Sequence, residues 1–349
     1  MKKILLVLVG GTICTLADRG VRKIETEKAR AMLVEHFRRS DSPFADESAL
    51  RIDVGARFDT LSENMSFPLW NKLKEYFEGR PYDGYDGVIV AHGTDTLAYT
   101  AAMFSFLLSG TEVPVFFVAA NAPLDRAESN GGENFRAAAE CICSGIAPNI
   151  YAAYRNPKDG KTYLHLASRL VQSADFEGNF FSRGMQDIST FAQRRAVRFG
   201  GVRMRADFGG ALRGRKLENC VLKLDPYVGM DYGAYRLEQF RAVLHGTYHS
   251  GTVCAGSPEQ NGNILRLAQD CEQRGIGLYV IPVNGMREGG EIYESMTPVL
   301  RRARFLFGLT EEAAYAKLSI ACSCLTGEEF WDFLGENING EYADDNGQG

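Results

Sequence analysis

The sequence lacks the features that define several large classes of protein. No stretch approaches the roughly 20 consecutive apolar residues that a membrane-spanning helix needs. The first apolar run, residues 4–9, meets two glycines at once, so we expect a buried strand there and not a secretory signal. The 39 Lys and Arg residues are outnumbered by 44 Asp and Glu residues and form no long basic stripe. These absences predict a chain with no membrane and no nucleic acid as partner.

Nucleotide and metal motifs are missing as well. There is no G-x-x-x-x-G-K-[ST] segment, and no G-x-G-x-x-G segment follows an expected strand, which argues against a nucleotide enzyme. Eight cysteines are present, but none forms a C-x-x-C pair and most lie in apolar surroundings. We therefore expect buried free thiols in a reducing, cytoplasmic compartment and no metal site.

Short apolar runs alternate with longer amphipathic ones along most of the chain. The apolar runs are continuous, as is typical of strands buried on both faces, and the strand-then-helix order predicts parallel sheets with right-handed crossovers. The expected strands are residues 4–9, 87–91, 113–119, 150–154, 220–224, 242–247 and 277–283. The expected helices are residues 26–39, 67–78, 96–108, 134–143, 263–274 and 310–323.

A chain of 349 residues is longer than a typical single domain, so two α/β domains are expected. Residues 194–216 are rich in arginine and glycine and poor in large apolar side chains. We predict an N-terminal domain over 1–190, a linker over 191–216 and a C-terminal domain over 217–349. The predicted fold class is α/β, with a twisted parallel sheet in the N-terminal domain and a smaller α/β C-terminal domain.

Two loops leave expected strands with glycine and hydroxyl-bearing residues: the first loop, residues 9–13 (VGGTI), and the second loop, residues 91–96 (AHGTDT). Ligands of open parallel sheets bind beyond the carboxyl ends of the strands. Glycines there let backbone amides approach a ligand and face a developing negative charge. Thr12 is placed to act as a nucleophile if a neighbouring group takes its proton. Beside Thr94, the carboxylate of Asp95 is suited to orienting a base or gripping an ammonium group.

Each loop also has a purely structural interpretation. Thr12 is then no more than the end of a strand, and Thr94 or Asp95 caps the helix that begins near Thr96, a role in which these residue types are favoured. Short motifs discriminate poorly between such alternatives, so a single loop does not decide between them. The two loops taken together are far more specific.

The pair of segments GGTI, residues 10–13, and HGTDTLAYT, residues 92–100, closely resembles the two signature segments of the L-asparaginase/glutaminase family. Between them lies the third loop, residues 61–65 (LSENM), which resembles the substrate loop of that family. The resemblance covers roughly residues 3–325 and is closest to the bacterial type I, cytoplasmic branch. It implies a two-domain, asparaginase-like α/β fold.

The resemblance also implies roles for particular residues. Thr12 corresponds to the primary nucleophile, which attacks the side-chain amide and forms an acyl-enzyme, and Thr94 corresponds to the second catalytic threonine. Asp95 corresponds to the carboxylate that binds the α-ammonium group of the substrate, with help from Glu63. Ser62 corresponds to a ligand of the α-carboxylate. A zwitterionic amino acid needs one cluster of acceptors and one of donors, and these residues supply both.

Gly11 and Gly93 complete the substrate-binding set implied by the family. The implied reaction is hydrolysis of L-asparagine to L-aspartate and ammonia, with a small amino-acid amide as the partner and without a cofactor. Family members are homodimers or homotetramers, so the resemblance implies a homo-oligomer here.

Two positions depart from the family pattern, and both concern proton transfer. The family places a tyrosine in the loop after the nucleophile, but residues 14–22 contain none, and Val21 takes its place if Gly20 keeps the register. It also places a lysine upstream of a Phe-Ser pair, here residues 181–182, and counting back reaches Val171 or Gln172. Glutamine hydrogen-bonds but neither accepts a proton at neutral pH nor carries a positive charge. Gln172 and His249 are the candidates to replace the lost groups.

These departures leave three functional hypotheses open. The first is a threonine-dependent amidohydrolase of L-asparagine with altered proton transfer. The second is a catalytically degenerate protein that binds aspartate or asparagine through Ser62, Glu63 and Asp95 without turning it over. The third is an amidase for another small amide, with a reshaped pocket.

Overall fold

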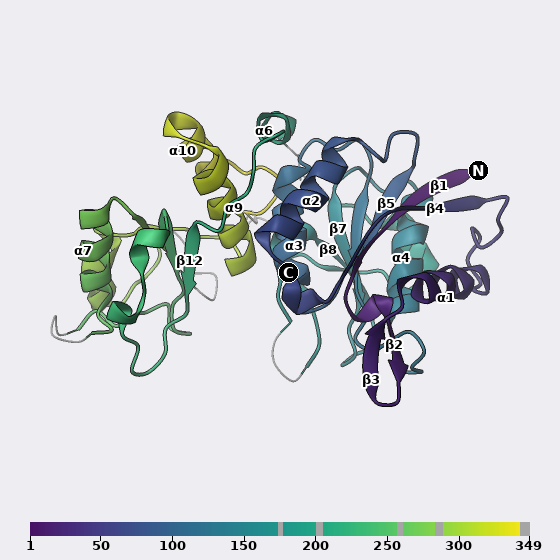
Figure 1. The fold of residues 1–349 in the computed structure, drawn as a ribbon, viewed down its shortest axis with the longest axis horizontal. Coiled ribbons are helices and arrows are strands. Elements are labelled where there is room, and N and C mark those ends of the chain that lie inside the picture. The colour runs from purple at the N-terminus through teal and green to yellow at the C-terminus, as the bar shows by residue number, and fades with distance from the viewer. Residues whose placement is uncertain (174–176, 200–204, 257–260, 283–288, 343–349) are drawn as a thin grey trace. The chain divides into compact units, whose positions relative to one another are not determined.

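A computed structural model describes residues 1–173, 177–199, 205–256, 261–282 and 289–342. The described chain divides into two compact units, each an α/β structure. The first unit comprises Met1–Gly214 and Ile338–Gly340, and the second comprises Arg215–Asn337 with Glu341 and Tyr342. Figure 1 shows the path of the chain, coloured from purple at the N-terminus to yellow near the C-terminus.

The first unit is built on a seven-stranded sheet with the order β11-β8-β7-β6-β5-β1-β4. Neighbours from β4 through β1, β5 and β6 to β7 pair in parallel, whereas β8 and β11 are antiparallel. The strands are β1 (Lys2–Gly10), β4 (Leu50–Thr60), β5 (Gly87–Ala91), β6 (Val115–Val118), β7 (Ile150–Arg155), β8 (Thr162–Leu166) and β11 (Gln186–Asp187). The expectation of a mostly parallel sheet is confirmed.

Helices cover both faces of this sheet (Figure 1): α1 (Thr26–Arg38) and α4 (Gly131–Cys143) lie on one face, and α2 (Phe67–Glu78) and α3 (Leu97–Leu107) lie on the other. The β1 residues 4–9 are all buried, because successive side chains of a strand point to opposite faces and both faces are covered.

Strand β1 lies where the order of the sheet reverses. It pairs with β4 on one side and with β5 on the other, both in parallel. The carboxyl ends of the three strands, at Gly10, Thr60 and Ala91, therefore lie next to one another at one edge of the sheet. Such a reversal is where open α/β sheets bind ligands, because the connections leave the strand ends in opposite directions.

Smaller elements complete the first unit. Strands β2 (Thr15–Asp18) and β3 (Val21–Ile24) form an antiparallel hairpin directly after β1. Arg19 and Gly20 at its turn both have positive φ angles, which fits the right-handed twist of a short hairpin. The others are β9 (Leu170–Val171), β10 (Phe181–Ser182), α5 (Phe191–Ala196) and α6 (Ala206–Ala211).

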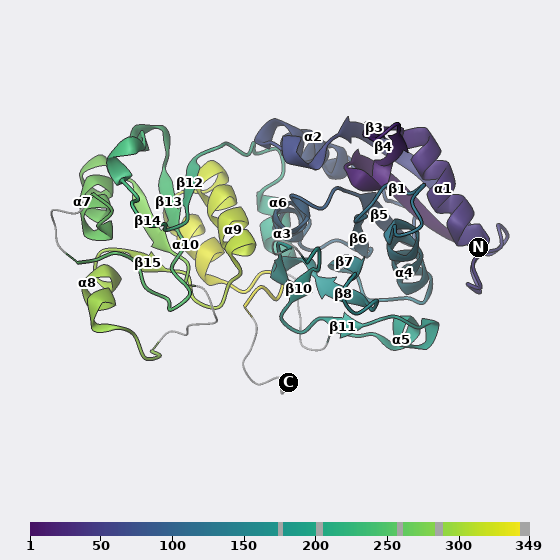
Figure 2. The same cartoon turned by 90° about the horizontal axis from the view of Figure 1, so that it is seen from below.

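The second unit contains a parallel four-stranded sheet with the order β12-β13-β14-β15. Figure 2 shows α7 and α8 on one side of this sheet and α9 on the other. Its strands are β12 (Val221–Leu224), β13 (Ala242–His245), β14 (Gly277–Val280) and β15 (Arg304–Phe305). Its helices are α7 (Ile264–Arg274), α8 (Thr297–Leu300), α9 (Glu311–Cys324) and α10 (Gly327–Gly335).

All the expected strands and helices are present, with ends that shift by a few residues. The last residue of the seventh expected strand, Val283, lies outside the described residues. Strand β4 was not expected. Its apolar residues alternate with polar ones because it is the edge strand of the sheet and its side chains are mostly half-buried, so it has no continuous apolar run.

The stretch expected as a linker carries buried structure in its first part. Thr190 and Gln193 form a capping box that begins α5. The side chain of Arg194 is only 1% exposed and forms ion pairs with Glu140, at 2.8 Å, and with Glu133. These contacts tie α5 to α4, and residues 191–214 are grouped with the first unit. The domain limits expected from the sequence stay a prediction.

Replacing Arg194 by alanine is expected to lower the free energy of unfolding by about 3 kcal/mol, because the buried carboxylate of Glu140 loses a charged partner. Urea denaturation followed by circular dichroism measures the change. The matched control is Arg195→Ala, since this neighbour is exposed and its loss should stay within about 0.5 kcal/mol of zero. Equal stability of the two variants would contradict the structural role of Arg194.

Candidate active site

The candidate site is formed by three loops that follow three neighbouring parallel strands. The first loop follows β1 and continues into a short 3₁₀ turn, Thr12–Cys14. The third loop follows β4 and contains a similar turn, Ser62–Asn64. The second loop follows β5 and leads into α3. Because β1 lies between β4 and β5, all three loops emerge at the point where the sheet reverses.

The first and second loops touch at two glycines. A Cβ atom added to Gly11 would lie 2.1 Å from the Cα atom of Gly93. A Cβ atom added to Gly93 would lie 2.4 Å from the Cβ atom of Ser62 and 2.9 Å from the Cα atom of Gly11. Gly11 also has a φ angle of 74°, which residues with a side chain rarely adopt. Glycine is therefore required for the loops to meet, and their contact brings Thr12, Thr94 and Ser62 to one place.

Hydrogen bonds hold the third loop against the other two. The backbone N–H of Gly11 donates to the carbonyl oxygen of Thr60 at 2.8 Å. The Ser62 hydroxyl oxygen accepts from the backbone N–H of Thr96 at 3.2 Å, and the Thr96 hydroxyl donates to the Ser62 carbonyl oxygen at 3.0 Å. The N–H of Gly11 is therefore bonded within the protein and does not face a ligand. Gly11 contributes to the site by lacking a side chain, which lets the first and second loops approach each other.

Four polar side chains around this contact have no partner among the residues that the structure describes. Within the described parts of the chain, no hydrogen bond or ion pair involves the side chains of Thr12, Glu63, Thr94 or Asp95. Thr12 and Thr94 are half-buried, and both carboxylates are exposed. The N-cap of α3 is Thr96, and no side chain caps this helix end. The structural interpretation of Thr94 and Asp95 as capping residues is therefore not what the fold shows.

Gln172 lies against the second loop. Its side-chain amide N–H donates to the Thr94 carbonyl oxygen at 2.8 Å, and its amide oxygen accepts from the backbone N–H of Ala98 at 3.3 Å. The residue follows β9, so it reaches the loop from a segment far along the chain. Val171 and Gln172 were the two candidates for the position of the family lysine. Gln172 contacts the second loop, whereas the side chain of Val171 is 36% exposed. Gln172 can fix this loop but cannot take a proton from it.

The hairpin of β2 and β3 holds the position at which the family resemblance leads us to expect a tyrosine. Val21 is 59% exposed and supplies no hydroxyl. The backbone N–H of Ala17 donates to the two carboxylate oxygens of Asp125 at 3.2 and 3.1 Å. The sequence did not predict this role of Asp125. The contact joins residues more than a hundred positions apart, and no local sequence pattern indicates it.

Two histidines of the first unit, His92 and His165, are buried and bonded to their own surroundings. His92 is fully buried, which lowers its pKa to about 4, and its Nδ1 lies 2.8 Å from the Gly93 carbonyl oxygen. Burial likewise lowers the pKa of His165 to about 3, and its Nδ1 lies 2.9 Å from the Ser182 hydroxyl. Both rings therefore stay neutral at pH 7. His249 is exposed and belongs to the second unit, so its expected role stays a prediction.

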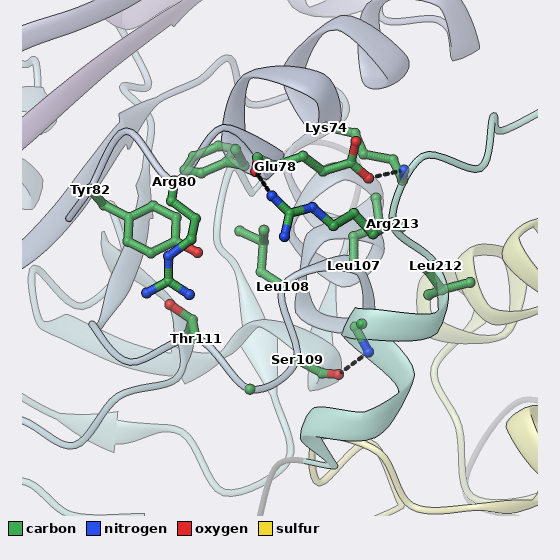
Figure 3. Close-up of a pocket in the computed structure, with 14 residues that line it drawn as sticks. Lys74, Glu78, Arg80, Tyr82, Leu107, Leu108, Ser109, Thr111, Leu212 and Arg213 are labelled. Carbon is green, nitrogen blue, oxygen red and sulfur yellow. Dashed lines mark hydrogen bonds and ion pairs between the residues drawn. The ribbon is translucent and has the colours of Figure 1, made fainter.

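A pocket of about 190 Å³ in the first unit lies away from these loops. Figure 3 shows its lining, in which Lys74 and Glu78 come from α2 and Leu107 from the end of α3. Arg213 donates to the Glu78 carbonyl oxygen at 2.8 Å. Helix α3 has 11 residues, which separates its two ends by about 16 Å. The pocket is therefore at the opposite end of α3 from the second loop.

Two other kinds of feature are absent from the described residues. No group of three or more His, Cys, Asp or Glu side chains there is arranged to hold a metal ion. None of the described helices combines the length and the apolar character that crossing a bilayer requires.

These features define a two-unit α/β protein with a cluster of polar side chains at the switch point of its larger sheet. The chain belongs to the asparaginase family: residues 3–192, more than half of its length, match the family described as "Asparaginase, N-terminal". The family resemblance expected from the sequence is confirmed.

The fold is similar to solved structures of L-asparaginases. The thermostable L-asparaginase from Thermococcus kodakarensis is 22% identical with a TM-score of 0.72, over 98% of this chain and 99% of that chain. L-asparaginase I from Vibrio cholerae is 19% identical with a TM-score of 0.68, over 98% and 99% of the two chains. At these identities the likeness establishes the fold, and the expected α/β fold class is confirmed.

Curated relatives carry a different name. One glutamyl-tRNA(Gln) amidotransferase subunit, from Methanobrevibacter smithii, is 30% identical over 169 residues, which are 48% of this chain and 37% of the relative. The protein of the same name from Methanothermobacter thermautotrophicus is 32% identical over 160 residues, or 46% and 35%. The match thus spans little more than a third of the length of these relatives.

The contact between glycines yields a stability prediction. Gly93→Ala should lower the free energy of unfolding by about 1–3 kcal/mol, because the new methyl group has no room between Ser62 and Gly11. Chemical denaturation measures the effect. Gly210→Ala is the matched control: this glycine lies in α6 with open space around it, and alanine there should stabilise by about 0.5–1 kcal/mol. A Gly93→Ala protein as stable as the parent would refute the close packing of the loops.

Proposed function

We propose that this protein is an amidohydrolase that cleaves the side-chain amide of L-asparagine to L-aspartate and ammonia, with Thr12 as nucleophile. The observation that carries the proposal is the convergence of Thr12, Thr94 and Asp95 on loops locked together at Gly11 and Gly93, with their side chains uncommitted to other described residues. Membership of the asparaginase family supports the same chemistry.

The charges around the loops suit a free amino acid. Asp95 and Glu63 are exposed carboxylates and can accept hydrogen bonds from an α-ammonium group. Ser62 is buried beside them, and its hydroxyl can donate to an α-carboxylate. A substrate held at both ends in this way presents its side-chain amide to Thr12 or Thr94. In this proposal, substrate binding fixes the distance between the hydroxyl and the amide, which lowers the barrier through orientation.

The reaction that we propose proceeds in two steps. The Thr12 hydroxyl oxygen attacks the amide carbon, a carbon–oxygen ester bond forms, and the carbon–nitrogen bond breaks to release ammonia with the hydroxyl proton. Water then attacks the ester, which releases aspartate and returns the proton to Thr12. Thr94 is the second hydroxyl in the proton path, and Gln172 positions the second loop through its two hydrogen bonds.

Ammonia release from L-asparagine and L-glutamine at pH 7–9 tests the proposal. We expect turnover of L-asparagine that falls by about 10³-fold or more in Thr12→Ala, because the nucleophile is lost. Thr12→Ser is the matched control, since it keeps a hydroxyl at the same position and should retain part of the activity. Turnover that survives unchanged in Thr12→Ala would reject Thr12 as nucleophile.

One observation favours a second candidate function, a protein that binds aspartate or asparagine without cleaving it. Gln172 stands at the second loop in place of the family lysine, and Val21 is exposed in place of the tyrosine, while Ser62, Glu63 and Asp95 are retained. Calorimetry with L-aspartate separates the two functions. Binding without ammonia release from any amide would support this candidate. Turnover of glutamine alone would instead point to an amidase of another small amide.

Restoring the lysine gives a sharper test of the altered proton transfer. Gln172→Lys is expected to raise kcat for L-asparagine, by up to about 10²-fold, because a positioned acid–base group contributes on that scale. The ammonium group of the new lysine can still donate to the Thr94 carbonyl oxygen that Gln172 now contacts at 2.8 Å.

The control is Gln172→Leu, which removes both hydrogen bonds to the second loop and should lower kcat. A Gln172→Lys variant no faster than the parent, with an unchanged dependence of kcat on pH, would show that proton transfer at this position does not limit the rate. The cytoplasmic location and the homo-oligomeric state expected from the sequence stay predictions.

A further inference from the structure

Two cysteines of the second unit lie in contact, and neither belongs to the proposed active site. Cys220 directly precedes β12, and Cys322 lies in the last turns of α9. Cys322 lies in the same turn of α9 as Ser319 and Ser323. The Cys220 sulfur also lies 3.4 Å from the Ser323 hydroxyl oxygen and 4.0 Å from the Ser319 carbonyl oxygen. The side chain of Cys220 therefore rests against one turn of α9.

The chemical surroundings of this pair differ from those of the other buried thiols. The hydrogen bond from Cys322, with a further one from Ser323 and the positive charge of Arg241, lowers the pKa of Cys220 to about 7. The pKa of Cys322 is raised, because its thiol donates toward Cys220 and because burial disfavours its charged form. By contrast, burial raises the pKa of Cys141 to about 12. Near neutral pH, a substantial share of Cys220 is therefore in the thiolate form that attacks peroxides.

One member of the pair, Cys322, lines a pocket. A hollow of about 740 Å³ in the second unit is lined by Cys322, Arg241 and Trp331, among others. The guanidinium group of Arg241 donates to the Cys322 carbonyl oxygen at 2.6 Å, which keeps its charge next to the sulfur atoms. Cys322 is 9% exposed and Cys220 is 4% exposed. A molecule as small as hydrogen peroxide that enters this hollow meets Cys322, in the turn of α9 against which Cys220 rests.

We propose that Cys220 and Cys322 are a site of reversible oxidation, at which a small hydroperoxide converts the two thiols to a disulfide. The Cys220 thiolate attacks one peroxide oxygen, a sulfur–oxygen bond forms, the oxygen–oxygen bond breaks, and the leaving hydroxide takes up a proton to become water. The Cys322 sulfur then attacks the Cys220 sulfur, the sulfur–oxygen bond breaks, and the second hydroxide leaves as water with the Cys322 proton. Two thiols and one peroxide thus give one disulfide and two waters.

The position of the pair gives the disulfide a structural consequence. It joins the start of β12 to α9 and so closes a long loop that includes β13, β14 and most of the second unit. Crosslinks that close long loops restrict the unfolded chain most. Oxidation is therefore expected to make the second unit more resistant to unfolding, and a dithiol reductant reverses the effect by thiol–disulfide exchange.

Peptide mapping of the full-length protein tests this proposal without any mutation. The reduced protein is treated with one equivalent of hydrogen peroxide at pH 7, blocked with iodoacetamide, digested without reductant and analysed by mass spectrometry. We expect a crosslinked peptide pair that contains Cys220 and Cys322, a whole-chain mass lower by two hydrogens, and a melting temperature higher by several degrees, about 2–5 °C. Dithiothreitol should reverse all three changes.

Variants identify the reacting sulfurs. Cys322→Ser is expected to abolish the crosslink and leave Cys220 as a sulfenic acid that dimedone labels, since no second thiol resolves it. The matched control, Cys271→Ser, removes a buried thiol of the same unit whose pKa burial raises to about 11, and it should leave the crosslink intact. A crosslink through Cys324, or no crosslink while both thiols remain alkylatable, would overturn the proposal.

Discussion

The close approach of Gly11 and Gly93, with Ser62 beside them, is the constraint on which the candidate site depends. Three parallel strands end side by side, and their loops meet where a single Cβ atom would lie only 2.1–2.4 Å from another backbone or side chain. The N–H of Gly11 donates to Thr60 and so fixes the first loop to the end of β4. Because a backbone bond and the Ser62–Thr96 hydrogen bonds hold this junction, the side chains of Thr12, Thr94, Asp95 and Glu63 are not needed to stabilise it and remain available to a ligand.

Gln172 shows how the same scaffold accepts a change in chemistry. An amide side chain donates to one backbone group and accepts from another, and Gln172 does both at the second loop. A lysine offers donors only, so it would leave the N–H of Ala98 without this acceptor but would bring a positive charge. Gln172 therefore fixes the second loop but cannot transfer a proton. Because the fold is the same in both cases, only measurements of turnover and of ligand binding separate the hydrolase from the binding protein.

Much of the fold could be predicted because the short continuous apolar runs of this chain are strands covered on both faces. Strand β4 escaped that rule since its residues alternate at a sheet edge, and α5 escaped because Arg194, a residue normal in linkers, is buried against Glu140. The residues of the three loops were found through local motifs. The contact of Asp125 with Ala17 was not, because it depends on a pairing across the fold that leaves no periodicity in the sequence.

The charges on the three loops are all negative. Asp95 and Glu63 face solvent near the meeting point of the loops, and among the described residues no lysine or arginine forms an ion pair with either carboxylate. A lysine at position 172 would place a positive charge by the second loop, but the neutral amide of Gln172 does not. The α-ammonium group of a bound amino acid would then supply the opposite charge itself. Binding should consequently weaken as ionic strength rises, because screening reduces the attraction between the ammonium group and exposed carboxylates.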